Sequence, residues 1–95
     1  MQIDELKNIS DPNILENIYH QAIWYELHNN WDRSHQIVQK LSSRHAKWVH
    51  AYLHRKEGDI GNSKYWYLQA EKNYPGNIGF DEEIRSILKE LDQSN

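Results

Sequence analysis

The chain has 95 residues, a length that suits one small domain with a single hydrophobic core. Its 11 Lys and Arg are outnumbered by 14 Asp and Glu, with both signs interleaved, so we expect no nucleic-acid binding. Cysteine is absent, which excludes disulfides and thiolate metal sites. No stretch approaches the roughly 18 apolar residues of a membrane span, and the acidic start does not suit a secretory signal. We therefore expect a cytoplasmic protein.

Capping and breaker residues divide the chain into expected helices. Asp11-Pro12 suits a helix start, because Asp can cap free backbone N–H groups and Pro is favoured in the first turn. Helix ends are expected at Asn29-Asn30, near Ser42-Ser43, at Gly58 and at the breaker cluster 74–77.

Apolar residues recur between these breakers at three- and four-residue spacing, as on the buried face of amphipathic helices. The segment 80–92 starts with acidic residues, which complement the dipole of a helix N-terminus, and continues with the same apolar spacing. The first ten residues show the pattern on a smaller scale. Because no β-type alternation occurs, the sequence predicts an all-α domain of five or six helices.

The strongest internal pattern lies in residues 44–77. Its positions are Ala51, Gly58, Ser63, Tyr67, Ala70 and Pro75. This pattern resembles the tetratricopeptide repeat, in which a turn glycine separates two helices and a proline closes the unit. Small residues at Ala51 and Ser63 would let two antiparallel helices approach closely.

The resemblance implies one domain over residues 1–95, an α-α superhelix of two antiparallel hairpins and a cap. The first hairpin covers 12–43, where Asn29 replaces the turn glycine, the second covers 44–77, and the capping helix covers 80–92. Such arrays generally need about three repeats for stability, so a homodimer that covers the exposed end face is one expectation.

A second resemblance rests on three strings of the sequence. They are Trp24-Tyr25-Glu26-Leu27-His28, Asp32-Arg33-Ser34-His35 and residues 50–59. The strings are similar to a group of short bacterial proteins of uncharacterised function. This resemblance covers most of the chain and implies no activity.

Tetratricopeptide domains bind partner peptides in a concave groove formed by the first helix of each hairpin. By position, the resemblance assigns to this groove Tyr19, Ile23, Trp48, Tyr52, Arg55 and Lys56. We therefore predict a non-enzymatic interaction module for a protein or peptide, with Trp48, Tyr52 and Arg55 as one exposed stripe. The alternative is that the terminal helices fill the groove, because solenoids need caps.

Histidines provide a candidate site of another class. His50, His54 and Glu57 lie four and three residues apart, on one face of the expected helix, where they could bind a divalent metal ion or a small ligand. The alternative is that these imidazoles serve packing in the seam between two helices. His28 and His35 are further candidate ligands without a spacing argument.

An enzyme is less favoured than an interaction module. Ser34 and His35 are neighbours in sequence and therefore point to different sides of a helix. The string Gly58-Asp59-Ile60-Gly61 lacks the lysine of a phosphate-binding loop and follows no strand. We accordingly expect no catalytic residues and no cofactor.

Overall fold

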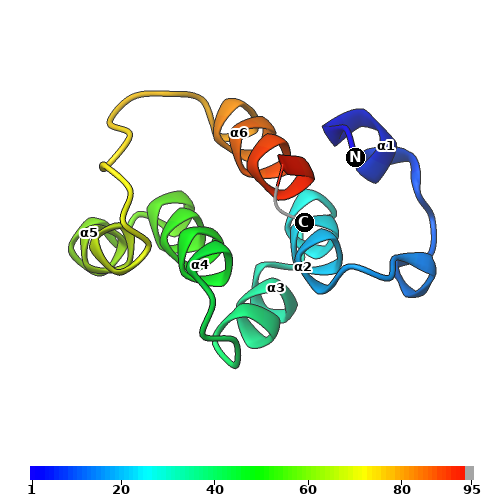
Figure 1. Ribbon diagram of the computed structural model, residues 1–95, viewed down its shortest axis with the longest axis horizontal. Helices are drawn as coiled ribbons and strands as arrows, with labels where there is room; N and C mark the ends of the chain where they lie inside the picture. Colours follow the sequence, from blue (N-terminus) through cyan, green and yellow to red (C-terminus); the bar gives the residue numbers. More distant parts are fainter. Residues whose placement is uncertain (94–95) are drawn as a thin grey trace.

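The computed structural model describes residues 1–93, which form six α-helices and one short 3-10 helix (Figure 1). The elements are α1 (Ile3–Asn8), η1 (Pro12–Ile14), α2 (Ile18–Leu27), α3 (Trp31–Val38), α4 (Arg44–Glu57), α5 (Ile60–Gln69) and α6 (Phe80–Gln93). These residues contain no strand, and the predicted all-α class is confirmed. None of these helices is long and apolar enough to cross a membrane.

Side-chain caps set where the central helices begin. Each cap accepts a hydrogen bond from a backbone N–H of the first turn, and the capping residues are Asn17, Asn30, Ser43 and Asp59. At the other end of α4, Gly58 adopts a φ of 90°, a left-handed conformation that glycine reaches without strain. The predicted helix end at Gly58 is confirmed.

The predicted cap at Asp11-Pro12 is present, but the predicted long helix does not continue from it. Asp11 caps only the single 3-10 turn of η1, through Asn13 N–H, after which the backbone is extended at Leu15. The side chain of Gln21 donates to the Leu15 carbonyl at 2.6 Å, so this carbonyl is satisfied without a continuous helix. Leu15 is buried, and the first hairpin helix starts at Ile18.

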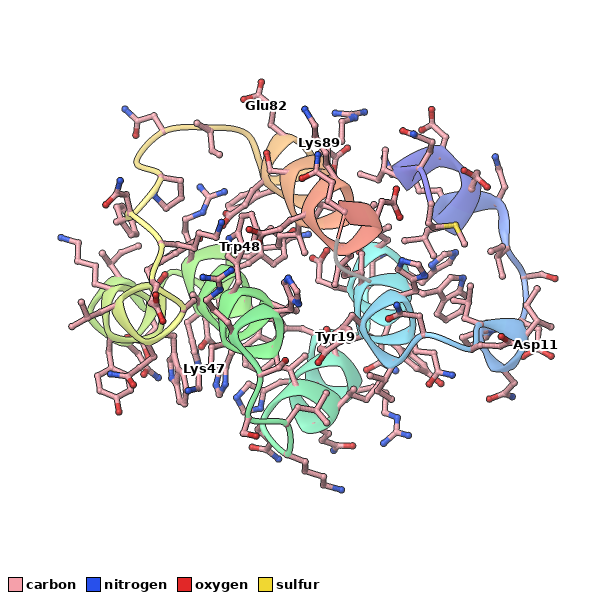
Figure 2. The ribbon with its side chains drawn as sticks, in the orientation of Figure 1. Asp11, Tyr19, Lys47, Trp48, Glu82 and Lys89 are labelled. Carbon is pink, nitrogen blue, oxygen red and sulfur yellow. The ribbon has the colours of Figure 1, made fainter. Side chains whose placement is uncertain are left out.

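The helices pack in sequence-adjacent pairs, α2 with α3 and α4 with α5, and α3 joins the two pairs by packing on α4. The last helix, α6, returns to pack against α4 and α1. Figure 1 shows α4 near the centre of the molecule, with α5 and α1 at opposite ends. Side chains Glu82 and Lys89 project from the side of α6 that faces away from α4 (Figure 2).

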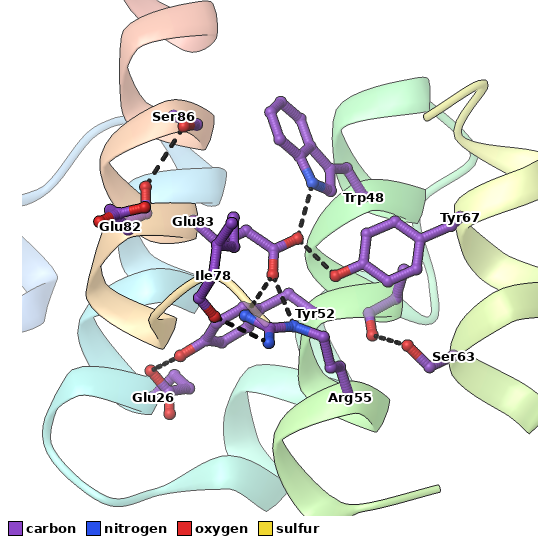
Figure 3. Close-up of polar contacts among 11 residues, drawn as sticks. Glu26, Trp48, Tyr52, Arg55, Ser63, Tyr67, Ile78, Glu82, Glu83 and Ser86 are labelled. Atoms are coloured by element: carbon purple, nitrogen blue, oxygen red, sulfur yellow. Dashed lines mark hydrogen bonds and ion pairs between the residues drawn. The ribbon is translucent and has the colours of Figure 1, made fainter. Parts of the chain in front are cut away.

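The contact between α4 and α5 is close because two small residues meet there. Ser63 Oγ donates a hydrogen bond to the Ala51 carbonyl at 2.9 Å, and both residues are fully buried (Figure 3). The predicted close approach of these two residues is confirmed.

Replacing Ala51 by Leu should lower the free energy of unfolding by about 1–3 kcal/mol, because the larger side chain overpacks the α4–α5 contact. Urea denaturation followed by circular dichroism measures this change. An unchanged midpoint would mean that the two helices are not held at this distance.

Candidate functional site

The surface predicted to bind a partner is covered by α6. Trp48, Tyr52 and Arg55 are 8%, 2% and 7% exposed, so the predicted exposed stripe is wrong. The cause lies in α6 itself, whose buried apolar residues need a partner face. They are Ile84, Ile87, Leu88 and Leu91. The chain thus covers the predicted groove surface with its own C-terminal helix, which is the alternative that the sequence analysis also considered.

The other predicted groove residues have different surroundings. Ile23 is buried in the core, whereas Tyr19 is half-buried and its hydroxyl lies 2.6 Å from Ser43 Oγ. Lys56 keeps a side chain that is 38% exposed and forms an ion pair with the buried carboxylate of Glu26. Among the predicted groove residues of α4, Lys56 is therefore the most accessible to solvent.

One carboxylate of α6 is the centre of the polar contacts between α6 and the α4–α5 pair (Figure 3). Glu83 Oε2 accepts hydrogen bonds from Trp48 Nε1 at 3.0 Å and from Tyr67 Oη at 2.5 Å. Glu83 Oε1 pairs with the Arg55 guanidinium, whose Nε and Nη2 each lie at 2.9 Å. Glu83 is 1% exposed, so this charge is removed from water and fully partnered by protein groups.

Arg55 also binds the segment that leads into α6. Its Nη1 donates to the Ile78 carbonyl at 3.1 Å, and its guanidinium lies 4.5 Å from the centre of the Phe80 ring. The edge of Tyr52 meets the same ring, with centroids 6.1 Å apart. The first turn of α6 is therefore held by charge, backbone and aromatic contacts together.

Two buried hydroxyls donate to the two buried carboxylates. Tyr52 Oη donates to Glu26 Oε2 at 3.0 Å, and burial together with the Glu26 charge raises the pKa of Tyr52 far above its ordinary value of 10.0. Burial and the hydrogen bond to Glu83 raise the pKa of Tyr67 in the same way. Both tyrosines therefore stay protonated and act as hydrogen-bond donors.

Sequence reasoning missed Glu83 and Tyr67 as parts of this site. Glu83 was interpreted as one of three first-turn acids that complement the dipole of α6. A signal was present, because Glu83 lies four residues before Ile87 and thus on the apolar face of the helix. An acidic residue on such a face needs a buried partner.

The predicted metal-ligating residues lie on the opposite side of α4, in contact with α3 and α5. His50 and His54 are each 7% exposed, and the indole of Trp66 stacks on His50 with centroids 4.0 Å apart. His54 Nδ1 lies 2.6 Å from a carboxylate oxygen of Glu57. The structure adds His35, whose Nε2 lies 3.1 Å from His50 Nε2.

His28 is not part of this cluster. Its ring stacks on Trp24 with centroids 3.8 Å apart, and its Nδ1 lies 2.8 Å from the Trp24 carbonyl oxygen. Of the two further candidate ligands, the fold therefore brings only His35 to the pair on α4.

Burial favours the neutral form of two imidazoles of this cluster, His50 and His35. Burial, followed by the neighbouring rings of His35 and His54, lowers the pKa of His50 from 6.5 to about 4. Burial also lowers the pKa of His35. A hydrogen bond between His35 Nε2 and His50 Nε2 requires one lone pair, so the two rings cannot both be charged.

Comparison with known proteins gives no relative: no family model, curated protein or solved structure matches the chain.

The free energy of unfolding should fall as the pH is lowered from 6.5 towards 4. The unfolded chain binds a proton at His50 near pH 6.5, whereas the folded chain binds it only near pH 4. The stability contributed by the neutral ring is therefore complete above pH 6.5 and is lost across this window. Urea denaturation at several pH values between about 7 and 5, above the main titration of carboxylates, measures the slope.

The matched control is His50→Gln, which cannot bind the proton and should show a shallower slope over the same pH range. Equal slopes in the two proteins would contradict this assignment.

Proposed function

We propose that the chain is a non-enzymatic interaction module, built as two tetratricopeptide-like hairpins, whose groove binds an amphipathic helix. The observation that carries the proposal is that α6 docks on this surface through Glu83. Its carboxylate accepts hydrogen bonds from Trp48, Tyr67 and Arg55. In this proposal α6 is an internal ligand, and a partner protein supplies a helix of the same kind in its place.

The chemistry of the groove indicates which helices it would accept. Arg55 gives it positive charge, which pairs with Glu83 in the first turn of α6. The other two acidic residues of this turn lie elsewhere, because Asp81 pairs with Lys7 of α1 and Glu82 projects away from α4. Apolar residues then follow at helical spacing. A suitable partner helix therefore carries an aromatic or apolar start, one glutamate directed into the groove and an aliphatic stripe behind it.

The connection between α5 and α6 determines how strongly a partner helix must bind to displace α6. Residues 70–79 form no helix or strand and contain Pro75 and two further glycines, Gly76 and Gly79. A helix joined by so short a segment docks at an effective concentration in the millimolar range, which a partner in trans must overcome. A second copy of the chain carries the same α6, so exchange of this helix between two copies is one form in which a homodimer would arise.

The test uses the full chain and a fluorescent peptide with the sequence of residues 79–93. Wild-type protein should bind the peptide weakly, because its own α6 occupies the groove. Glu83→Gln leaves Arg55 without its buried partner and loosens α6, so this variant should bind the peptide at least about tenfold more tightly. Fluorescence anisotropy measures the binding.

Glu82→Gln is the matched control, because Glu82 is the preceding residue and projects away from α4. It removes the same charge and should bind as the wild type does. Adding Trp48→Ala to Glu83→Gln should abolish the gain. If Glu83→Gln keeps its helical circular dichroism and binds no peptide, the groove does not accept a helix in trans and α6 is only part of the core.

A further inference from the structure

We propose that His35, His50 and His54 bind one divalent transition-metal ion where α3 and α5 meet α4. The site lies on the side of α4 opposite to α6, since residues 50 and 54 are about half a helical turn from residues 48 and 52. It is therefore independent of the groove and of the function proposed for it.

The first argument is the spacing of the ligand atoms. One ring nitrogen from each of the three histidines lies within 4.8 Å of the other two. Zn–N bonds of about 2.0–2.1 Å in a tetrahedral site place two nitrogens roughly 3.3 Å apart. His35 Nε2 and His50 Nε2, at 3.1 Å, are already near this separation. Small rotations of the His54 ring would complete a three-nitrogen face.

The second argument is the hydrogen bonding of His54. The Glu57 carboxylate, 2.6 Å away, accepts a hydrogen bond from Nδ1–H of His54, so the lone pair of the neutral ring is on Nε2. Asn62 Nδ2 donates to this lone pair at 3.3 Å. A carboxylate behind a histidine is the arrangement that orients metal-ligating imidazoles in proteins. The contact with Asn62 thus identifies Nε2 as the His54 nitrogen that would bind the ion.

The third argument is that two tryptophans hold the other rings in place. Trp31 lies parallel to His35, with centroids 4.9 Å apart and 9° between planes, and Trp66 lies parallel to His50 at 4.0 Å and 14°. Stacking of this kind restricts ring rotation, so little ordering of the ligands is needed when an ion binds.

The donor set determines the class of metal. Three imidazoles without thiolates suit zinc, copper or nickel, whereas magnesium and calcium prefer oxygen ligands. Three protein ligands leave a fourth position for water, as in zinc sites that are not fully closed. The expected occupant is a single Zn²⁺ or an ion of similar preference.

The experiment titrates the full, tag-free chain with ZnCl₂ by isothermal calorimetry at about pH 7.5, which is above the ordinary pKa of an imidazole. One ion should bind per chain. His35→Gln, His50→Gln and His54→Gln should each weaken binding at least about tenfold, and Glu57→Gln about tenfold through the orientation of His54. His28→Gln is the matched control, because His28 also stacks on an indole and lies outside the cluster; its binding should equal that of the wild type.

Co²⁺ provides a test on the wild-type protein that does not depend on the folding of any variant. A four-coordinate site of three imidazoles and one water gives Co²⁺ intense visible absorption, whereas surface binding leaves the weak spectrum of the six-coordinate ion. Absence of a 1:1 heat signal with Zn²⁺, a weak Co²⁺ spectrum, or equal loss of binding in His28→Gln and His50→Gln would each overturn the proposal. None of these results bears on peptide binding in the groove.

Discussion

The placement of α6 depends on one buried carboxylate, that of Glu83. A charge at this depth is strongly destabilising unless every lone pair finds a donor, and here an indole, a phenol and a guanidinium supply them. The donors come from α4 and α5, so the single acceptor fixes the rotation of α6 about its axis and its position along α4. Apolar burial alone, which is not directional, would fix neither.

The central helix α4 carries different chemistry on its two sides. Towards α6 it offers Trp48 and Arg55, which donate to Glu83, and towards α2 it offers Tyr52, which donates to Glu26. Towards α3 and α5 it offers His50 and His54. The first set needs a negative partner, whereas burial of His50 lowers its pKa and favours the neutral ring. An amphipathic helix usually has one buried face. The burial of both sides of α4 explains why it is the helix around which α3, α5 and α6 gather (Figure 1).

Local features of this fold could be predicted from the sequence, because they depend on neighbours along the chain. The turn at Gly58 follows from the conformational freedom of glycine, and the close approach of Ala51 and Ser63 follows from their size. The start of the first hairpin was predicted at the wrong place because Asp11-Pro12 and Asn17 are both good caps. The burial of Leu15 decides between them.

The long-range features could not be predicted from spacing. The stripe Trp48, Tyr52 and Arg55 has the composition of an interface, and an interface with a helix of the same chain has the same composition as one with a partner. Only the position of α6 against α4 in the folded chain distinguishes these two kinds of interface. Likewise, His35 joins His50 from another helix, with no local pattern that links the two residues.

Native-state hydrogen exchange tests most directly whether α6 is a separable occupant of the groove. Amide protons of Ile87 and Leu88 report on α6, and those of Tyr52 and Leu53 report on α4. The account predicts that the α6 amides exchange through an opening at least about 1 kcal/mol less costly than that of α4, with the smaller denaturant dependence of a sub-global event. Equal free energies and equal denaturant dependence for the two helices would show that α6 opens only when the whole domain unfolds, and would contradict the account.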